Sequence, residues 1–315
     1  MQERTTCRSD WAPFVFQSLN GRRRFCASRV STCARRQKET MRGVNSDRTG
    51  KAMANFNPPR YTTRIIKAGA LIADTKTLFF RWDVEQSVDE NLCRVRRQNL
   101  LGKTSRSRLE DILLIMRQRY LGEESVARAL ACLVKSPCSR GSVDRILYFH
   151  AAKADCLLRD VVLEILVPKW GDGITQISVT ELHRKLYQWV AAGKTTTAWT
   201  QTTIRRVAQG LLSTLRDFGV LQGAVKKRIG PAYLPLPAFC YIAFYLKQKE
   251  VSGAKLLDAT DWKLFFLTPE SVERLLVEAN QHGLLEYHAA GSVARLTFPA
   301  TTIDQYAHVL TRATA

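Results

Sequence analysis

The chain has 315 residues, with 48 Lys and Arg against 28 Asp and Glu, a formal net charge of +20 and a pI near 9.9. This length is sufficient for two or three small domains. No apolar run reaches the ~18–20 residues of a membrane span, so we expect a soluble, cytoplasmic protein without a membrane partner. The excess of cations favours a polyanionic partner, which is DNA, RNA or an anionic membrane surface.

Residues 1–52 differ in composition from the rest, with twelve Lys and Arg against four Asp and Glu. Such a segment is typical of a disordered basic arm that binds nucleic acid. It is also typical of a transit-like presequence. A third interpretation is translated upstream sequence with the true start at Met53, and the abrupt change in composition favours it.

From residue 61 to residue 167 the apolar periodicity predicts helices only, and we expect a helical bundle domain over 53–167. One helix begins at Thr63, and Thr104 or Ser105 caps another. The last predicted helix of this region, 143–166, has a broad apolar stripe and is expected to be the central helix of the bundle. The predicted segments after the first are 83–101, 105–120, 125–134 and 143–166.

The segment 168–173, PKWGDG, interrupts the periodicity and predicts a linker. After it, Ser178 or Thr180 caps a helix that ends near residue 190, and a second helix covers 199–218. A hairpin follows and completes a domain over 174–237. The remaining domain, 238–315, begins with an apolar helix and ends with a short helix over 303–310.

A repeated pattern relates residues 211–235 to residues 275–299. In each copy a Leu-Leu pair precedes a Gly, an apolar pair follows that Gly, and a Pro ends the segment. The Gly residues, Gly219 and Gly283, are typical of helix ends in the left-handed conformation. A helix followed by a two-stranded ribbon is the second half of a winged helix-turn-helix. The predicted fold is therefore mostly α, with an N-terminal helical bundle followed by two winged-helix-like units with small β-hairpins.

The two copies differ in charge. Residues 194–235 contain seven Lys and Arg and one Asp, a net +6, whereas residues 268–299 contain two Arg and four Glu, a net −2. The basic copy is therefore the expected DNA-binding unit. We expect the acidic copy to pack against the chain or to bind protein.

The predicted DNA contacts lie mainly in the basic unit. One helix face carries side chains that can bond base edges or phosphates, and the hairpin adds three cations. The alternative for each residue is an ordinary solvated face. The predicted contacts are Thr202, Arg205, Arg206 and Gln209 on the helix, with Lys226, Lys227 and Arg228 on the hairpin.

A second basic cluster lies between two helices of the predicted bundle. It includes Arg94, Arg96 and Arg97, and its candidate phosphate contacts are Lys103, Arg106 and Arg108. Helix N-termini favour phosphate, which supports contacts there. Glu110 and Asp111 follow directly, so an ordinary cationic face is the alternative.

Neither catalysis nor cofactor binding is indicated. The five histidines have no metal-ligand spacing, and the common nucleotide-binding and hydrolase motifs are missing. The cysteines form no CxxC pair, and we expect Cys93, Cys132, Cys156 and Cys240 to be reduced core thiols. We therefore expect no enzyme, metal, cofactor or small-molecule substrate, although a dispersed nuclease centre would escape motif analysis.

Three segments, at residues 99–121, 148–162 and 211–227, stand out as a set. Together they resemble the BrxA family of bacterial BREX (bacteriophage exclusion) defence systems. The likeness covers about residue 61 to the C-terminus. It implies a non-enzymatic, double-stranded-DNA-binding accessory protein that acts beside other BREX components. A scaffold without direct DNA contact is the alternative. The segments that carry the resemblance are Asn99-Leu-Leu to Arg119-Tyr-Leu, Tyr148-Phe-His-Ala-Ala to Leu158-Arg-Asp-Val-Val, and Leu211-Leu-Ser-Thr-Leu-Arg-Asp-Phe-Gly-Val-Leu-Gln-Gly to Lys226-Lys.

Overall fold

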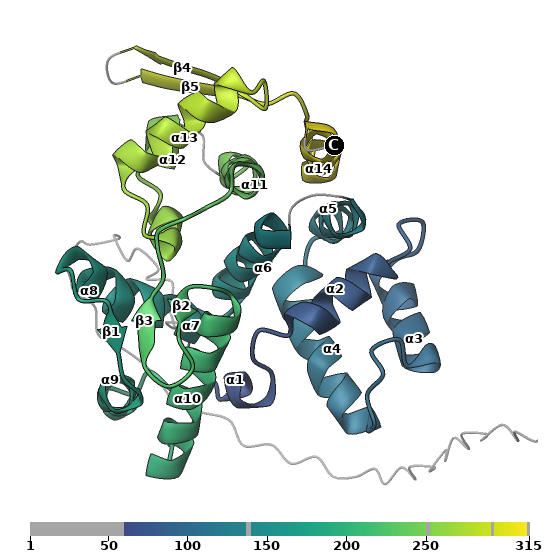
Figure 1. Cartoon of the computed structure of the whole chain (residues 1–315). Coiled ribbons are helices and arrows are strands. Elements are labelled where there is room, and N and C mark those ends of the chain that lie inside the picture. The colour runs from purple at the N-terminus through teal and green to yellow at the C-terminus, as the bar shows by residue number, and fades with distance from the viewer. Residues whose placement is uncertain (1–59, 137–139, 250–252, 291–292, 314–315) are drawn as a thin grey trace, which may run out of the picture. The chain divides into compact units, whose positions relative to one another are not determined.

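The computed structural model describes residues 60–136, 140–249, 253–290 and 293–313. These residues form a mostly helical protein with two small antiparallel sheets (Figure 1). The mostly α fold class is therefore confirmed. The predictions for the basic segment 1–52 fall outside the described residues.

The N-terminal part contains five helices, two of which begin at serine caps. Ser105 Oγ accepts a hydrogen bond from Arg108 N at 3.2 Å, and Ser87 forms a capping box with Glu90. The predicted first helix is divided into two helices, because the chain turns at Leu71, whose φ of 52° is left-handed. The helices are α1 (Arg64–Lys67), α2 (Ile72–Phe80), α3 (Val88–Gln98), α4 (Arg106–Tyr120) and α5 (Glu124–Lys135).

The prediction of one continuous helix over 143–166 is wrong. Asp155 interrupts it, because Asp155 Oδ1 accepts from Leu157 N at 3.1 Å and thereby caps a new helix. The predicted linker at 168–173 is also wrong, since helix continues to Gly171 with Pro168 in a first turn, where a missing N–H costs little. The observed elements are α6 (Arg140–Ala154), α7 (Cys156–Val161), the π-helical turn η1 (Val162–Leu166) and α8 (Val167–Gly171).

A three-stranded sheet and two helices follow. The order along the chain is β1, α9, α10, β2, β3, and the order in the sheet is β1-β3-β2 with both pairs antiparallel. Strand β1 was not anticipated, because two residues are too few to produce an alternating pattern. The bounds are β1 (Gln176–Ile177), α9 (Val179–Ala191), α10 (Gln201–Asp217), β2 (Leu221–Gln222) and β3 (Lys227–Ile229).

The C-terminal part repeats the helix-hairpin order once. Gly219 after α10 and Gly283 after α13 both have positive φ, 75° and 66°, as their place in the repeat predicts. The second hairpin, β4–β5, forms its own two-stranded sheet. The elements are α11 (Leu236–Lys247), α12 (Gly253–Leu257), the 3₁₀ helix η2 (Thr260–Phe265), α13 (Pro269–Gln281), β4 (Glu286–Ala290), β5 (Val293–Thr297) and α14 (Ile303–Ala313).

The core is centred on α6 and α11. Every residue of α11 from Ala238 to Leu246 is buried, and the hydroxyl of Tyr148 in α6 donates to Leu264 O at 3.1 Å. The C-terminal helix α14 packs on α5 (Figure 1). Cys240 is buried as expected, but Cys93 is exposed because it faces outward from α3.

None of the described helices, including the very apolar α11, combines the length and the apolar character needed to cross a membrane.

One ionisable side chain, His150 of α6, is buried in this core, and its Nε2 lies 2.9 Å from the hydroxyl of Tyr241. Burial lowers the pKa of His150 to about 3, and the positive charges of Lys249 and Lys153 act in the same direction. The imidazole is therefore neutral at physiological pH. Protonation would place an unpaired charge in the core.

Folding stability should fall as pH drops below about 6.5, the pKa of an unperturbed histidine. Between that pH and about 3, the unfolded chain binds a proton at His150 that the folded chain does not. At about pH 5 the loss from this group is about 2 kcal/mol. Urea unfolding at about pH 7.5 and about pH 5 measures it.

His150→Gln is the control, because glutamine has no proton to gain in this range. The variant should show a flatter dependence of unfolding free energy on pH than the parent protein. An identical slope in both proteins would assign the pH dependence to other groups.

Candidate nucleic-acid interface

Helix α10 separates an apolar face from a cationic one. Thr200 Oγ1 accepts from Thr203 N at 3.2 Å and caps its N-terminus. The predicted core stripe is buried and comprises Ile204, Val207, Ala208, Leu211, Leu215 and Phe218. The predicted contact residues of this helix lie on the opposite side, where Thr202, Arg205, Arg206 and Gln209 are all exposed. The structure thus brings these four side chains to the solvent-facing side of α10.

The two arginines of this face have no internal partner. Neither Arg205 nor Arg206 makes a hydrogen bond or ion pair with another residue in the described part of the chain. By contrast, Arg216 in the last turn binds Asp217 at 2.7 Å. Exposed guanidinium groups without a carboxylate nearby retain their five donors for an external acceptor.

Helix α9 packs against α10 and fixes its direction. Ser178 Oγ accepts from Glu181 N at 3.1 Å, so the predicted serine cap of α9 is confirmed. Between the helices the chain turns at Gly193, whose φ is 72°. The result is two packed helices joined by the segment 192–200, with the second helix exposing its cations.

The hairpin divides its three cations between different positions. Lys226 lies in the turn and is exposed, whereas Arg228 lies in β3 and projects from the exposed face of the sheet. Lys227 is half-buried, and its Nζ donates to Ala224 O at 2.8 Å across the turn. Lys227 and Arg228 therefore project from opposite faces of the sheet, because consecutive strand residues point to opposite faces.

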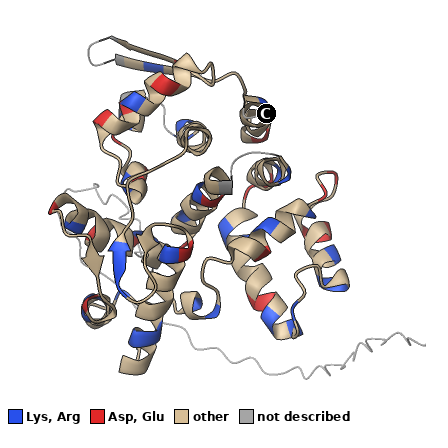
Figure 2. Cartoon of the chain, viewed as in Figure 1, with Lys and Arg blue, Asp and Glu red and all other residues tan. Residues whose placement is uncertain are grey.

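Arg228 lies in the central strand between two glutamines. It pairs with Gln176 of β1 and with Gln222 of β2, and both glutamines are exposed. The exposed face of the sheet thus carries one guanidinium between two amide side chains. Figure 2 shows this cationic strand beside α10. The two glutamines carry no signal in the sequence, because only the strand pairing brings residues 176 and 222 together.

Half of the cations in the second basic cluster pair with carboxylates of the described chain. Lys103 Nζ lies 2.7 Å from Asp74 Oδ1, and Arg108 donates to the carbonyl of Lys67. Arg94 is likewise engaged, at 3.5 Å from Asp83. Of the three predicted phosphate contacts, Arg106 is the one whose guanidinium has no partner among the described residues.

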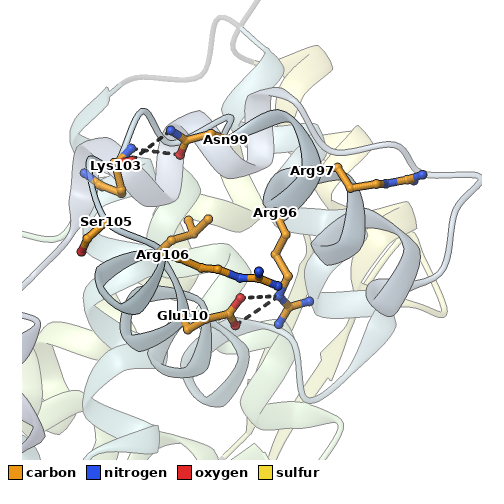
Figure 3. Close-up of a pocket in the computed structure, with 8 residues that line it drawn as sticks. Arg96, Arg97, Asn99, Lys103, Ser105, Arg106 and Glu110 are labelled. Atoms are coloured by element: carbon orange, nitrogen blue, oxygen red, sulfur yellow. Dashed lines mark hydrogen bonds and ion pairs between the residues drawn. The ribbon is translucent and has the colours of Figure 1, made fainter. Parts of the chain in front are cut away.

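Arg106 faces a pocket between α3 and α4 (Figure 3). In this pocket Arg96 Nε lies 2.9 Å from Glu110 Oε1. That ion pair raises the pKa of Arg96 through its hydrogen bond to Glu110. The structure therefore brings Lys103 and Arg106 to one pocket with Arg96, whereas Arg108 does not line it.

The second helix-hairpin unit presents a different surface. The hydroxyl of Tyr287 in β4 donates to Glu273 of α13 at 2.9 Å, and Arg274 bonds Ser271 at 3.1 Å. Burial, and secondarily the hydrogen bond to Glu273, raises the pKa of Tyr287 to about 12. The exposed face of α13 carries Glu270, Glu273 and Glu278 together with one arginine, Arg274 (Figure 2).

No three His, Cys, Asp or Glu side chains gather as a metal site would require within the part of the chain that the structure describes. Together, the elements above define a mostly helical protein that exposes cations from one helix and one small sheet.

Comparison with protein families gives a match to the BrxA family over residues 59–245. Comparisons with curated proteins and with solved structures give no significant match. The family match spans more than half of the chain, and this chain therefore belongs to the BrxA family. Membership makes it a protein of BREX anti-phage defence, as the resemblance at residues 99–121, 148–162 and 211–227 implies.

Gly223→Ala should destabilise the first hairpin. Gly223 has a φ of 91°, and a Cβ there would overlap the carbonyl oxygen of Lys226. We expect a loss of more than about 1 kcal/mol in unfolding free energy, together with faster hydrogen exchange of the hairpin amides. Urea titration and exchange mass spectrometry measure the two effects.

Gly193→Ala is the matched control. Gly193 also has a positive φ, but a Cβ there meets open space. Only the conformational cost of about 1 kcal/mol should appear, without faster exchange in the hairpin. Equal behaviour of both variants would show that the contact with Lys226 has no effect.

Proposed function

We propose that this BrxA-family chain is a non-enzymatic accessory protein that binds double-stranded DNA in a BREX system. The interface consists of the exposed face of α10 and the hairpin β2–β3. The observation that carries the proposal is a set of four exposed cations without a side-chain partner in the described chain. These are Arg205, Arg206, Lys226 and Arg228.

The arrangement of elements supports this proposal. A winged helix-turn-helix places its second helix in the major groove and its ribbon beside it. The order β1-α9-α10-β2-β3, with sheet order β1-β3-β2, has the connectivity that such a unit requires. In this interpretation Arg205, Arg206 and Gln209 approach base edges, while Lys226 and Arg228 approach phosphates.

Binding should weaken with salt, because phosphate contacts release counterions. The two phosphate contacts, Lys226 and Arg228, give a slope of roughly −1.8 in a plot of log K against log salt. Affinity for a duplex should therefore fall about tenfold between roughly 50 and 200 mM salt. Fluorescence anisotropy with a labelled duplex at several salt concentrations measures the slope.

The double variant Lys226→Ala/Arg228→Ala should weaken binding to all sequences and reduce the slope by about two. The matched control is Arg117→Ala/Arg128→Ala. It removes the same charge from exposed residues that already pair with Asp89 and Glu124. Equal losses in both double variants would attribute binding to net charge and contradict the hairpin assignment.

The second candidate is a scaffold that binds other BREX components and not DNA. The acidic face of α13 favours it, because Glu270, Glu273 and Glu278 suit a basic protein surface. Lack of duplex binding at about 50 mM salt would support the scaffold and overturn the DNA proposal.

The non-enzymatic part of the proposal has its own test. Duplex and single-stranded DNA should remain intact when the protein is added with Mg²⁺ or Mn²⁺. Metal-assisted hydrolysis needs side chains that hold the metal ion at the phosphate, and the described residues form no cluster of that kind. Denaturing gel electrophoresis detects cleavage. Metal-dependent fragments that persist after separate purifications would contradict the proposal.

A further inference from the structure

A pocket of about 420 Å³ lies where the C-terminal end of α3, the following loop and the N-terminal end of α4 meet. Its volume falls within the range of small-ligand sites, about 300–1,000 Å³. The walls combine charged side chains with the buried Leu109. The pocket can therefore hold a ligand that is larger than one inorganic anion and has an apolar part.

The charges inside the pocket are unbalanced. Arg96 Nε binds Glu110 Oε1 at 2.9 Å and Oε2 at 3.1 Å. Arg106 extends toward the same ion pair but has no partner of its own among the described residues (Figure 3). One carboxylate thus faces two guanidinium groups, and their net positive charge favours an anion between them.

The loop that forms the pocket wall is held in place by its own hydrogen bonds. Asn99 Nδ2 donates to Lys103 O at 3.0 Å, and Lys103 N donates to Asn99 Oδ1 at 3.0 Å. The side chain of Lys103 is fixed separately by its 2.7 Å ion pair with Asp74. The wall therefore exists without a ligand, which reduces the entropic cost of binding one.

We propose that this pocket binds a small phosphate ester of about mononucleotide size. The phosphate lies between Arg96 and Arg106, whose planar donors suit phosphate oxygens. The first backbone N–H groups of the 15-residue helix α4, next to Ser105, add further donors. The remainder of the ligand lies against Leu109. This site is separate from α10, and the inference does not rest on DNA binding.

Isothermal titration calorimetry of the full chain with AMP, adenosine and inorganic phosphate tests the ligand class. AMP should bind with saturation, adenosine should not bind, and inorganic phosphate should bind more weakly than AMP. Equal affinities for AMP and phosphate, or binding of adenosine, would overturn the proposal. Lack of any AMP binding would also overturn it.

Two substitutions should change AMP affinity in opposite directions. Arg106→Ala should weaken binding roughly tenfold to a hundredfold, the usual effect of losing a hydrogen bond to a charged group. Glu110→Gln should strengthen binding, because it removes the negative charge beside the phosphate. The guanidinium of Arg106 has no partner among the described residues to lose, so its substitution should leave the unfolding temperature unchanged.

Arg128→Ala is the matched control, since it removes the same charge from an exposed side chain that pairs with Glu124 and does not line the pocket. It should leave AMP affinity unchanged, and an effect equal to that of Arg106→Ala would overturn the pocket assignment. Duplex binding distinguishes the two sources of phosphate. If Arg106→Ala weakens duplex binding and AMP does not bind, the pocket belongs to a DNA interface and the proposal is wrong.

The DNA proposal can fail independently. Lys226→Ala/Arg228→Ala should bind AMP like the parent protein, whatever its effect on duplex binding. AMP binding without any duplex binding would leave the pocket assignment intact and remove the DNA function.

Discussion

Arg145 connects the central helix α6 to the end of α10. Its guanidinium donates to Phe218 O at 3.3 Å and to Gly219 O at 3.2 Å. Those carbonyls belong to the helix end, where no intrahelical donor remains for them. Burial lowers the pKa of Arg145. A half-buried arginine of α6 therefore holds the end of α10, and with it the start of the hairpin.

The hydrogen bonds of Arg145 explain how the unit formed by α10 and the first hairpin can expose cations and still be held to α6. The apolar stripe of α10 packs inward, Arg145 holds its last turn, and Gly219 lets the chain leave the helix at a φ of 75°. The exposed face then needs no role in stability. Arg205 and Arg206 are consequently not engaged by carboxylates of the described chain, whereas Lys103 and Arg96 are.

Local patterns predicted much of the fold, because they depend on neighbouring residues. The buried stripe of α10, the caps at Ser105 and Ser178, and the two Gly-terminated helices follow from spacing along the chain. The break at Asp155 did not follow, since the apolar stripe continues past it and only the aspartate cap shows the interruption.

Contacts between distant residues were the least predictable part of the candidate sites. The pairing of Lys103 with Asp74 spans 29 residues, and the chain carries too many carboxylates for spacing alone to select that partner. Strand β1 reaches β3 across two helices, so the position of Arg228 between Gln176 and Gln222 depends on tertiary pairing. The first contact engages Lys103 with a carboxylate, and the second places Arg228 on an exposed face of the sheet where a ligand can reach it.

The packing of α14 on α5 has a consequence for how the protein is made. Cys132 of α5 and His308 of α14 lie 3.3 Å apart but are separated by 176 positions in the chain. The family match ends at residue 245, before α14 begins. During synthesis the apolar side of α5 therefore stays uncovered until α14 has emerged from the ribosome. Until then it is a surface that chaperones can recognise.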